Sequence, residues 1–257
     1  MTISTQLPST PGSGARNSGP WPGILMQFAG IAVVAGGLAA WLTTADLTDT
    51  ESTTLAPGQL LGYIGQHLAL TFVSAFIVLL LGLPLGVLLT RPRLRAFSGP
   101  VLVIANVGQS APSIGLFVLL AFWLGFGFRA AIVGLVLYAL LPVLRNTMIG
   151  IKQVDAQLVE AGRGMGMSPL AVLFRIELPL ATPIMLSGIR TALVLLVGTA
   201  TLATFIDGGG LGLLITTGVN LDLPVVLVSG ALIVALLALL IDLLGRIMEQ
   251  LVQPKGL

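Results

Sequence analysis

The sequence has no cysteine, a single histidine and few charged residues, and each scarcity excludes a class of protein. Without cysteine there is no disulfide and no thiolate metal site, and His67 alone cannot form a histidine-rich site. Charged residues make up 9% of the 257 residues, against about 25% in soluble domains, while 56% are hydrophobic. This composition excludes a soluble globular domain and predicts an all-α, polytopic membrane protein.

Lysine is also scarce, which bears on nucleotide binding. Neither Lys152 nor Lys255 follows a glycine, so the phosphate-binding pattern G-x-x-x-x-G-K is absent. The glycine clusters at 162–164 and 208–210 lie outside any strand–turn–helix context, which disfavours a dinucleotide site. No H-E-x-x-H motif or nucleophile elbow occurs either. We therefore expect no catalytic residues, no metal or cofactor site and no nucleic-acid partner for this chain.

What the chain has in abundance is apolar runs, about six of which are long enough to cross a bilayer. We predict spanning helices at about 24–44, 67–89, 98–124, 130–148, 178–205 and 223–244. Residues 1–22 are rich in Ser, Thr, Pro and Gly, a composition typical of disorder. Acidic residues (Asp46, Asp49 and Glu51) predict a loop after the first span, and residues 207–222 predict another before the last.

The first apolar run has two interpretations, a retained helix or a cleaved signal peptide. It is long for a signal peptide and lacks a clear A-x-A cleavage site, which favours a retained helix. We accordingly predict a disordered tail at 1–22, an additional N-terminal helix with its loop at 23–58, the main transmembrane domain at 59–250, and a tail at 251–257.

The basic residues predict the orientation. If the N-terminus lies inside, only Arg129 lies outside and only Arg190 lies well within a span. This distribution follows the positive-inside bias, so we expect both termini to be cytoplasmic. The basic residues on or near the cytoplasmic side are then Arg16, Arg91, Arg93, Arg95, Arg145, Lys152, Arg163, Arg175, Arg246 and Lys255.

A polar segment at 155–179 interrupts the apolar runs. Asp155 is suited to cap a helix that starts at the next residue, because its carboxylate accepts from free backbone N–H groups. Ser168 and Pro169 are the N-cap and first residue of a second helix. Three glycines lie between the two: Gly162, Gly164 and Gly166. They weaken the first helix and leave its backbone open to another protein, so we predict two short helices joined by a glycine elbow.

An interfacial amphipathic helix lying on lipid is the alternative interpretation of this segment. Such a helix gains from being continuous, and three glycines in five residues disfavour it.

The spacing of Glu160-Ala161-Gly162, Gly166 and Ile176-x-Leu178-Pro179 resembles the EAA signature of bacterial ABC importer permeases. Gly162 stands where that family usually has alanine. The resemblance implies that the segment forms cytoplasmic coupling helices, which seat in a cleft of a separate ATP-hydrolysing subunit. The implied coupling residues are Asp155, Glu160, Ala161, Gly162, Gly164, Gly166, Ser168, Pro169, Ile176, Leu178 and Pro179.

Further stretches resemble the glycine betaine/carnitine/choline (osmoprotectant) permease subfamily: residues 111–115, 140–147, 150–155, 161–167 and 188–192. The resemblance covers about 60–250. It implies a type I importer core of five helices in the bacterial cytoplasmic membrane, here with one additional N-terminal helix. Its implied partners are two ATPase subunits that hold ATP and Mg²⁺, a second permease chain (identical or homologous) and an external substrate-binding protein. Another cargo, such as an amino acid or an oxyanion, remains an alternative. So does an ion-driven secondary transporter, although the internal repeats typical of that class are not evident.

Candidate pathway residues lie where a span is interrupted, at Gln109, Ser110, Pro112 and Ser113. Irregular backbone at membrane depth is tolerated where it faces protein or a water-lined cavity. The alternative is a proline kink whose polar groups are satisfied by neighbouring helices.

Two further candidates lie inside predicted spans. Arg190 is interpreted as the only charge well within a span, where burial costs about 2.5–3.5 kcal/mol, so we expect it to face the bundle and find a partner. It could act in the pathway or gate, or be a structural pair or a snorkelling side chain. Tyr138 offers an aromatic face of the kind that binds quaternary ammonium groups.

Overall fold

A computed structural model describes residues 21–252. The predicted tails at 1–22 and 251–257 therefore lie outside the described residues, except for two residues of each. Those residues belong to the first and last helices, so the first helix begins three residues earlier than predicted and the last one ends eight residues later.

The described part of the chain is helical and contains no β-strand. Two 3₁₀ turns, η1 (Arg95–Phe97) and η3 (Thr201–Ile206), and one π turn, η2 (Leu173–Glu177), accompany the α-helices. The α-helices are α1 (Trp21–Thr44), α2 (Asp49–Thr54), α3 (Pro57–Leu89), α4 (Ser98–Ser110), α5 (Ser113–Leu124), α6 (Phe128–Lys152), α7 (Ala156–Gly164), α8 (Pro169–Val172), α9 (Leu178–Ala200), α10 (Gly212–Asn220) and α11 (Pro224–Val252).

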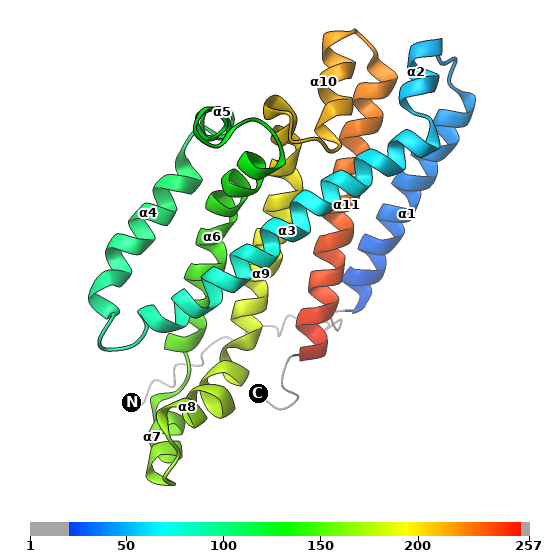
Figure 1. The fold of residues 1–257 in the computed structure, drawn as a ribbon. Helices are drawn as coiled ribbons and strands as arrows, with labels where there is room; N and C mark the ends of the chain where they lie inside the picture. Colours follow the sequence, from blue (N-terminus) through cyan, green and yellow to red (C-terminus); the bar gives the residue numbers. More distant parts are fainter. Residues whose placement is uncertain (1–20, 253–257) are drawn as a thin grey trace, which may run out of the picture.

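Five helices between residues 21 and 252 are long and apolar enough to cross a membrane, or six if α4 and α5 are counted as one bent span. This agrees with the prediction of about six. Helix α6 forms the centre of the bundle and packs against α3, α9, α4 and α5, while α11 packs against α9, α10 and α1 (Figure 1). Half of the apolar part of α6 is buried, against about a tenth of α1. The additional N-terminal helix is thus peripheral to the packed core.

Small residues set the distance between helices, as is usual where no hydrophobic driving force exists between apolar surfaces in lipid. A Cβ added to Gly188 on α9 would lie 2.9 Å from the carbonyl oxygen of Pro142 and 2.5 Å from Asn146 Cβ on α6. On the other side of α6, a Cβ on Gly86 of α3 would lie 2.7 Å from Thr147. Helix α6 is therefore held closely between α3 and α9.

Two segments predicted as loops contain short helices, so those predictions were wrong. In the first, Thr48 caps α2 and Glu51 bonds back to it in a capping box, a signal present in the T-x-x-E sequence but missed. In the second, residues 207–222 contain α10. The chain turns at Asp207 (φ 59°) and at Gly209 (φ 79°), and α10 then packs its buried face against α11.

The interrupted span does not continue in its original direction. Helices α4 and α5 meet at 101°, so α5 lies across the end of α4 rather than extending it. Ala111 has an extended conformation (ψ 144°) because the ring of the following Pro112 disfavours helical geometry at the residue before it. The break predicted at 108–113 is confirmed, and it is a sharp bend of the chain.

Candidate functional site: the helical hairpin of residues 155–179

Helices α7 and α8 lie at one end of the bundle, beyond the ends of α3 and α11 (Figure 1). The carboxylate of Asp155 accepts a hydrogen bond from the backbone N–H of Gln157 at 2.8 Å. The hydroxyl of Ser168 accepts one from the backbone N–H of Ala171 at 3.2 Å. Both predicted N-caps are thus confirmed, and they fix where the two helices begin.

The elbow between the two helices is a glycine-terminated helix end. Gly166 has a left-handed conformation (φ 81°), and its N–H donates to the carbonyl of Arg163 at 2.9 Å. The N–H of Met167 reaches back to the carbonyl of Gly162 at 3.1 Å. These two bonds form a Schellman motif, in which glycine is favoured because a Cβ is strained at positive φ. The predicted elbow is confirmed at residue 166.

The other two glycines lie within α7, so they do not extend the elbow. Gly162 is buried, and a Cβ there would lie 2.5 Å from Ile176 Cδ1. Its bare backbone is therefore covered by the chain's own η2 segment, and the expectation that another protein approaches it was wrong at this position. Gly164 is exposed, and among residues 21–252 nothing lies within 4 Å of the place where its Cβ would be.

The second helix was predicted as separate from the span that follows, but α8, η2 and α9 form one continuous helical stretch. At the junction the N–H of Leu178 donates to the carbonyl of Leu173, five residues back. The reason lies in Pro179, which has no N–H and whose ring would clash with the carbonyl of Arg175 in a regular α-helix. The wider π turn accommodates the proline without breaking the helix.

An ion pair ties this junction to another span. The guanidinium of Arg91, just beyond the end of α3, donates from both terminal nitrogens to the two carboxylate oxygens of Glu177. The Glu177 side chain is 8% exposed and that of Arg91 31%. A bidentate pair of this kind fixes orientation as well as distance, so α3 is linked to the base of the hairpin.

The hairpin exposes large apolar side chains as well as polar ones. Glu160 and Ala161 are exposed on α7, and Pro179 is exposed on α9, whereas Ile176 and Leu178 turn partly inward. Four large apolar side chains are between 48% and 72% exposed: Leu158, Met165, Leu170 and Phe174. None of the four is among the predicted coupling residues. We refer to them below as the hairpin patch.

The pathway candidates of the interrupted span lie together at the bend between α4 and α5. Ser110 and Pro112 are exposed there, while Gln109 and Ser113 are half-buried. Tyr138 reaches the same place from α6, because its hydroxyl donates to the carbonyl of Ala111 inside the bend. The tyrosine therefore donates to a backbone carbonyl that the bend leaves without a helical partner. This agrees with the alternative stated above, a proline kink whose polar groups are satisfied by neighbouring helices. The role of these residues in a pathway stays a prediction.

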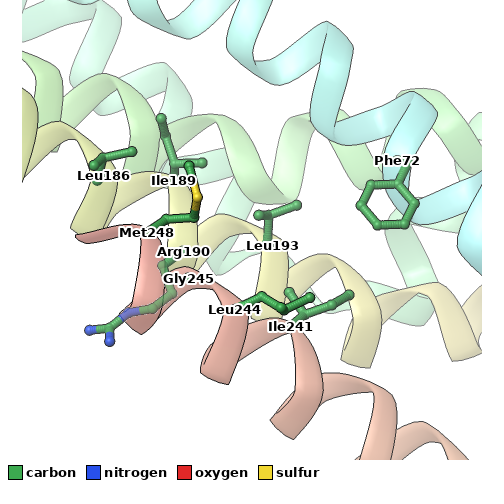
Figure 2. A pocket seen from close by; sticks show the side chains of 9 residues that line it. All are labelled: Phe72, Leu186, Ile189, Arg190, Leu193, Ile241, Leu244, Gly245 and Met248. Carbon is green, nitrogen blue, oxygen red and sulfur yellow. The ribbon is translucent and has the colours of Figure 1, made fainter. Parts of the chain in front are cut away.

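Arg190 lies on α9, beside a cavity of about 260 Å³ between α3, α9 and α11. Figure 2 shows its guanidinium directed away from the apolar side chains of that cavity, such as Leu193 and Phe72. The guanidinium pairs with two carboxylates of α11, Asp242 at 3.7 Å and Glu249 at 3.3 Å. The expected partner is thus present, in the form of a salt bridge between spans.

The interpretation of Arg190 as the only charge well within a span was wrong, because Asp242 of the spanning helix α11 lies beside it in the same bundle. Asp242 also accepts hydrogen bonds from Arg246 Nε at 2.9 Å and from Gln27 Nε2 at 3.1 Å. Gln27 belongs to α1, so this carboxylate joins three helices. No spacing within one helix could have indicated that contact.

A helical bundle with several spans, a sharply bent span and a hairpin at one end is the architecture of a polytopic membrane protein, and it agrees with the membrane subunit of a transporter. Residues 82–254 match the family described as binding-protein-dependent transport system inner membrane component. The chain belongs to this family, the permease subunits of ABC importers, and it is a multi-pass protein of the inner membrane.

Its relatives agree with the resemblance that the EAA signature implied. The chain is 42% identical over 200 residues to the glycine betaine/carnitine/choline transport system permease protein OpuCB of Bacillus subtilis, which covers 78% of this chain and 91% of the relative. It is 45% identical over 183 residues to the osmoprotectant import permease protein OsmY of Salmonella typhimurium, covering 71% and 78%.

A solved structure shows the same fold. The MetNI methionine ABC transporter in inward-facing conformations matches with a TM-score of 0.67 and 28% identity, over 76% of this chain and 96% of that one. The recognition made from the sequence is therefore confirmed, as is the permease fold.

Proposed function

We propose that this chain forms the translocation pathway of an importer for osmoprotectants, small quaternary amines such as glycine betaine, carnitine or choline. The observation that best supports this proposal is the hairpin, whose exposed apolar side chains are joined to the span α9 by a continuous helix. A separate ATPase subunit docks on Glu160 and on Leu158, Met165 and Leu170 of the hairpin patch, and ATP and Mg²⁺ bind to that subunit. Two ATPase subunits, a second permease chain and an external substrate-binding protein complete the assembly.

Exposed apolar side chains at the tip of a water-facing segment are a recognised mark of a protein interaction site. The alternative, a helix lying on lipid, requires a continuous helix along the membrane surface. Here α7 ends after nine residues and the chain reverses at Gly166. The arginines at 91, 93, 95, 163 and 175 share this end of the chain's spans. By the positive-inside bias, this supports a cytoplasmic location for the hairpin and for both termini.

Coupling is transmitted along two connections. Movement of α8 is passed to α9 through the continuous helix, and to α3 through the pair between Arg91 and Glu177. Because ligands and nucleotides shift transporters between packed states rather than deform them gradually, such rigid links suit alternation between inward-open and outward-open forms.

The experiment is reconstitution of the chain with its ATPase and permease partners in proteoliposomes, with ATP hydrolysis and uptake measured on the same samples. We expect Glu160→Lys and Gly166→Val to leave membrane insertion intact and to reduce uptake per ATP hydrolysed about tenfold. Glu160→Lys reverses a charge at the docking surface. Gly166→Val places a side chain in the left-handed region, which costs about 1–2 kcal/mol and disturbs the elbow. Gly125→Val is the matched control, because that glycine also has a left-handed conformation (φ 85°) and an open side-chain position but lies between α5 and α6, outside the hairpin. Normal uptake by the first two variants would reject the coupling assignment.

The cargo is tested separately. Competition of unlabelled betaine, carnitine, choline, methionine and sulfate for labelled betaine uptake distinguishes a quaternary amine importer from one for amino acids or oxyanions. Preference for methionine or sulfate would overturn the proposed cargo. Gradient-driven transport by the chain alone, without ATP, would indicate the secondary transporter class.

A further inference from the structure

A groove of about 510 Å³ separates the end of α3 from the base of the hairpin, and its lining is entirely apolar. Leu83, Val87 and Leu88 form one wall along α3, and Phe174 and Met185 lie on the opposite wall formed by η2 and α9. The lining residues extend over about 10 Å along α9, at about 1.5 Å per residue. The groove therefore runs from the end of the span into the bilayer region.

Charged residues lie near the lining residues at one end of the groove. Arg91 follows Leu88 by three residues, and Glu177 is adjacent to Leu178, another lining residue, so the ion pair between them lies at the groove's end. Two more arginines, Arg93 and Arg95, follow directly on the α3 side.

The hairpin side contributes a further basic residue. Arg175 is next to Phe174 and is exposed, as are Arg93 and Arg95. Within residues 21–252, the ion pairs involve none of these three arginines. Three exposed arginines thus follow closely in sequence the residues that line the apolar groove on its two sides.

We propose that this groove holds an acyl chain of an anionic phospholipid whose headgroup phosphate lies against Arg93, Arg95 and Arg175. Arginine binds phosphate oxygens through its planar fork, and basic residues at the membrane surface attract anionic lipids. The wall made by α3 belongs to a spanning helix, so lipid chains surround the groove in the membrane. This favours a lipid over a segment of a soluble subunit as its occupant.

The bound lipid would join two moving parts, because its chain contacts both α3 and the base of α9 while its headgroup bridges arginines from both sides. Occupancy therefore stabilises the arrangement in which the α3 end and the hairpin base are close together. This inference concerns the chain's own groove and does not depend on which solute is transported.

The absence of cysteine makes the test direct. Leu88→Cys introduces a single cysteine in the groove, and Phe76→Cys introduces one on the same helix outside it, where the side chain is 66% exposed. Each is labelled with a bimane fluorophore in the full-length chain, assembled with its partner subunits. Quenching is then compared in vesicles with brominated phosphatidylglycerol or brominated phosphatidylcholine.

We expect phosphatidylglycerol to quench the groove label at least about fivefold more effectively, because the attraction of even one basic residue near the surface, about 1 kcal/mol, corresponds to that ratio. At Phe76 the two lipids should quench equally. Changing Arg93, Arg95 and Arg175 together to Gln should abolish the preference.

A second variant, Val87→Phe, fills the groove without removing charge, so the orientation of the chain in the membrane is preserved. This variant should reduce quenching of the groove label by both lipids. Equal quenching by the two lipids at Leu88, or a preference that survives the loss of the arginines, would overturn the proposal. So would a groove label that neither lipid quenches in the assembled transporter, because another subunit would then occupy the groove.

Discussion

The ion pair between Arg91 and Glu177 provides a prediction whose direction follows from burial. The carboxylate is 8% exposed and the guanidinium 31%. Removing the arginine leaves an almost buried carboxylate without its partner, which costs about 3 kcal/mol. Removing the glutamate leaves a guanidinium that can turn toward water, so that loss is about 1 kcal/mol. We therefore expect Arg91→Ala to destabilise the protein much more than Glu177→Ala.

The double variant sharpens this expectation. With both partners gone no buried charge is left unpaired, so the double variant should be more stable than Arg91→Ala alone. Unfolding of the purified chain in detergent by graded SDS, followed by circular dichroism, measures the three free energies of unfolding, and a double-mutant cycle gives the coupling between the two side chains. Equal costs for the two single variants, or a double variant whose cost is the sum of both, would refute this explanation.

Two further predictions concern packing and the bent span. Gly188→Ala should destabilise the bundle by about 1–3 kcal/mol, because the added methyl meets a backbone carbonyl of α6, whereas Gly198→Ala on the same helix should be close to neutral; the same SDS titration compares them. Tyr138→Phe should cost about 1 kcal/mol by removing the donor to the carbonyl at the bend, and faster hydrogen exchange of the adjacent amides would report it. Unchanged stability in either variant would contradict the contact concerned.

Local features of the hairpin could be predicted from sequence because their causes are local. Asp155 and Ser168 act on N–H groups two or three residues away, and Gly166 is required by the geometry of its own turn. The span positions likewise follow from the length of apolar runs. These parts depend only on neighbouring residues in the chain.

Other features depend on contacts between distant segments and could not be predicted in the same way. Gly162 is small because Ile176, fourteen positions later, packs over it. Asp242 is tolerated in a span because Gln27 and Arg190 approach it from two other helices. Likewise α10 is stable because its apolar face packs against α11, whereas the glycine-rich segment before it suggested a loop. In each case the missing information was the arrangement of the helices.

The uninterrupted helix from α8 through the π turn to η3 has a mechanical consequence. Its 38 residues make a rod of about 57 Å, longer than the depth of about 40–45 Å of a bilayer with its headgroups. A tilt of about 5° imposed at one tip displaces the opposite end by about 5 Å, comparable to the pitch of a helix turn. The molecule can thus convert a small push at one membrane surface into an ångström-scale opening at the other, with no separate hinge in between.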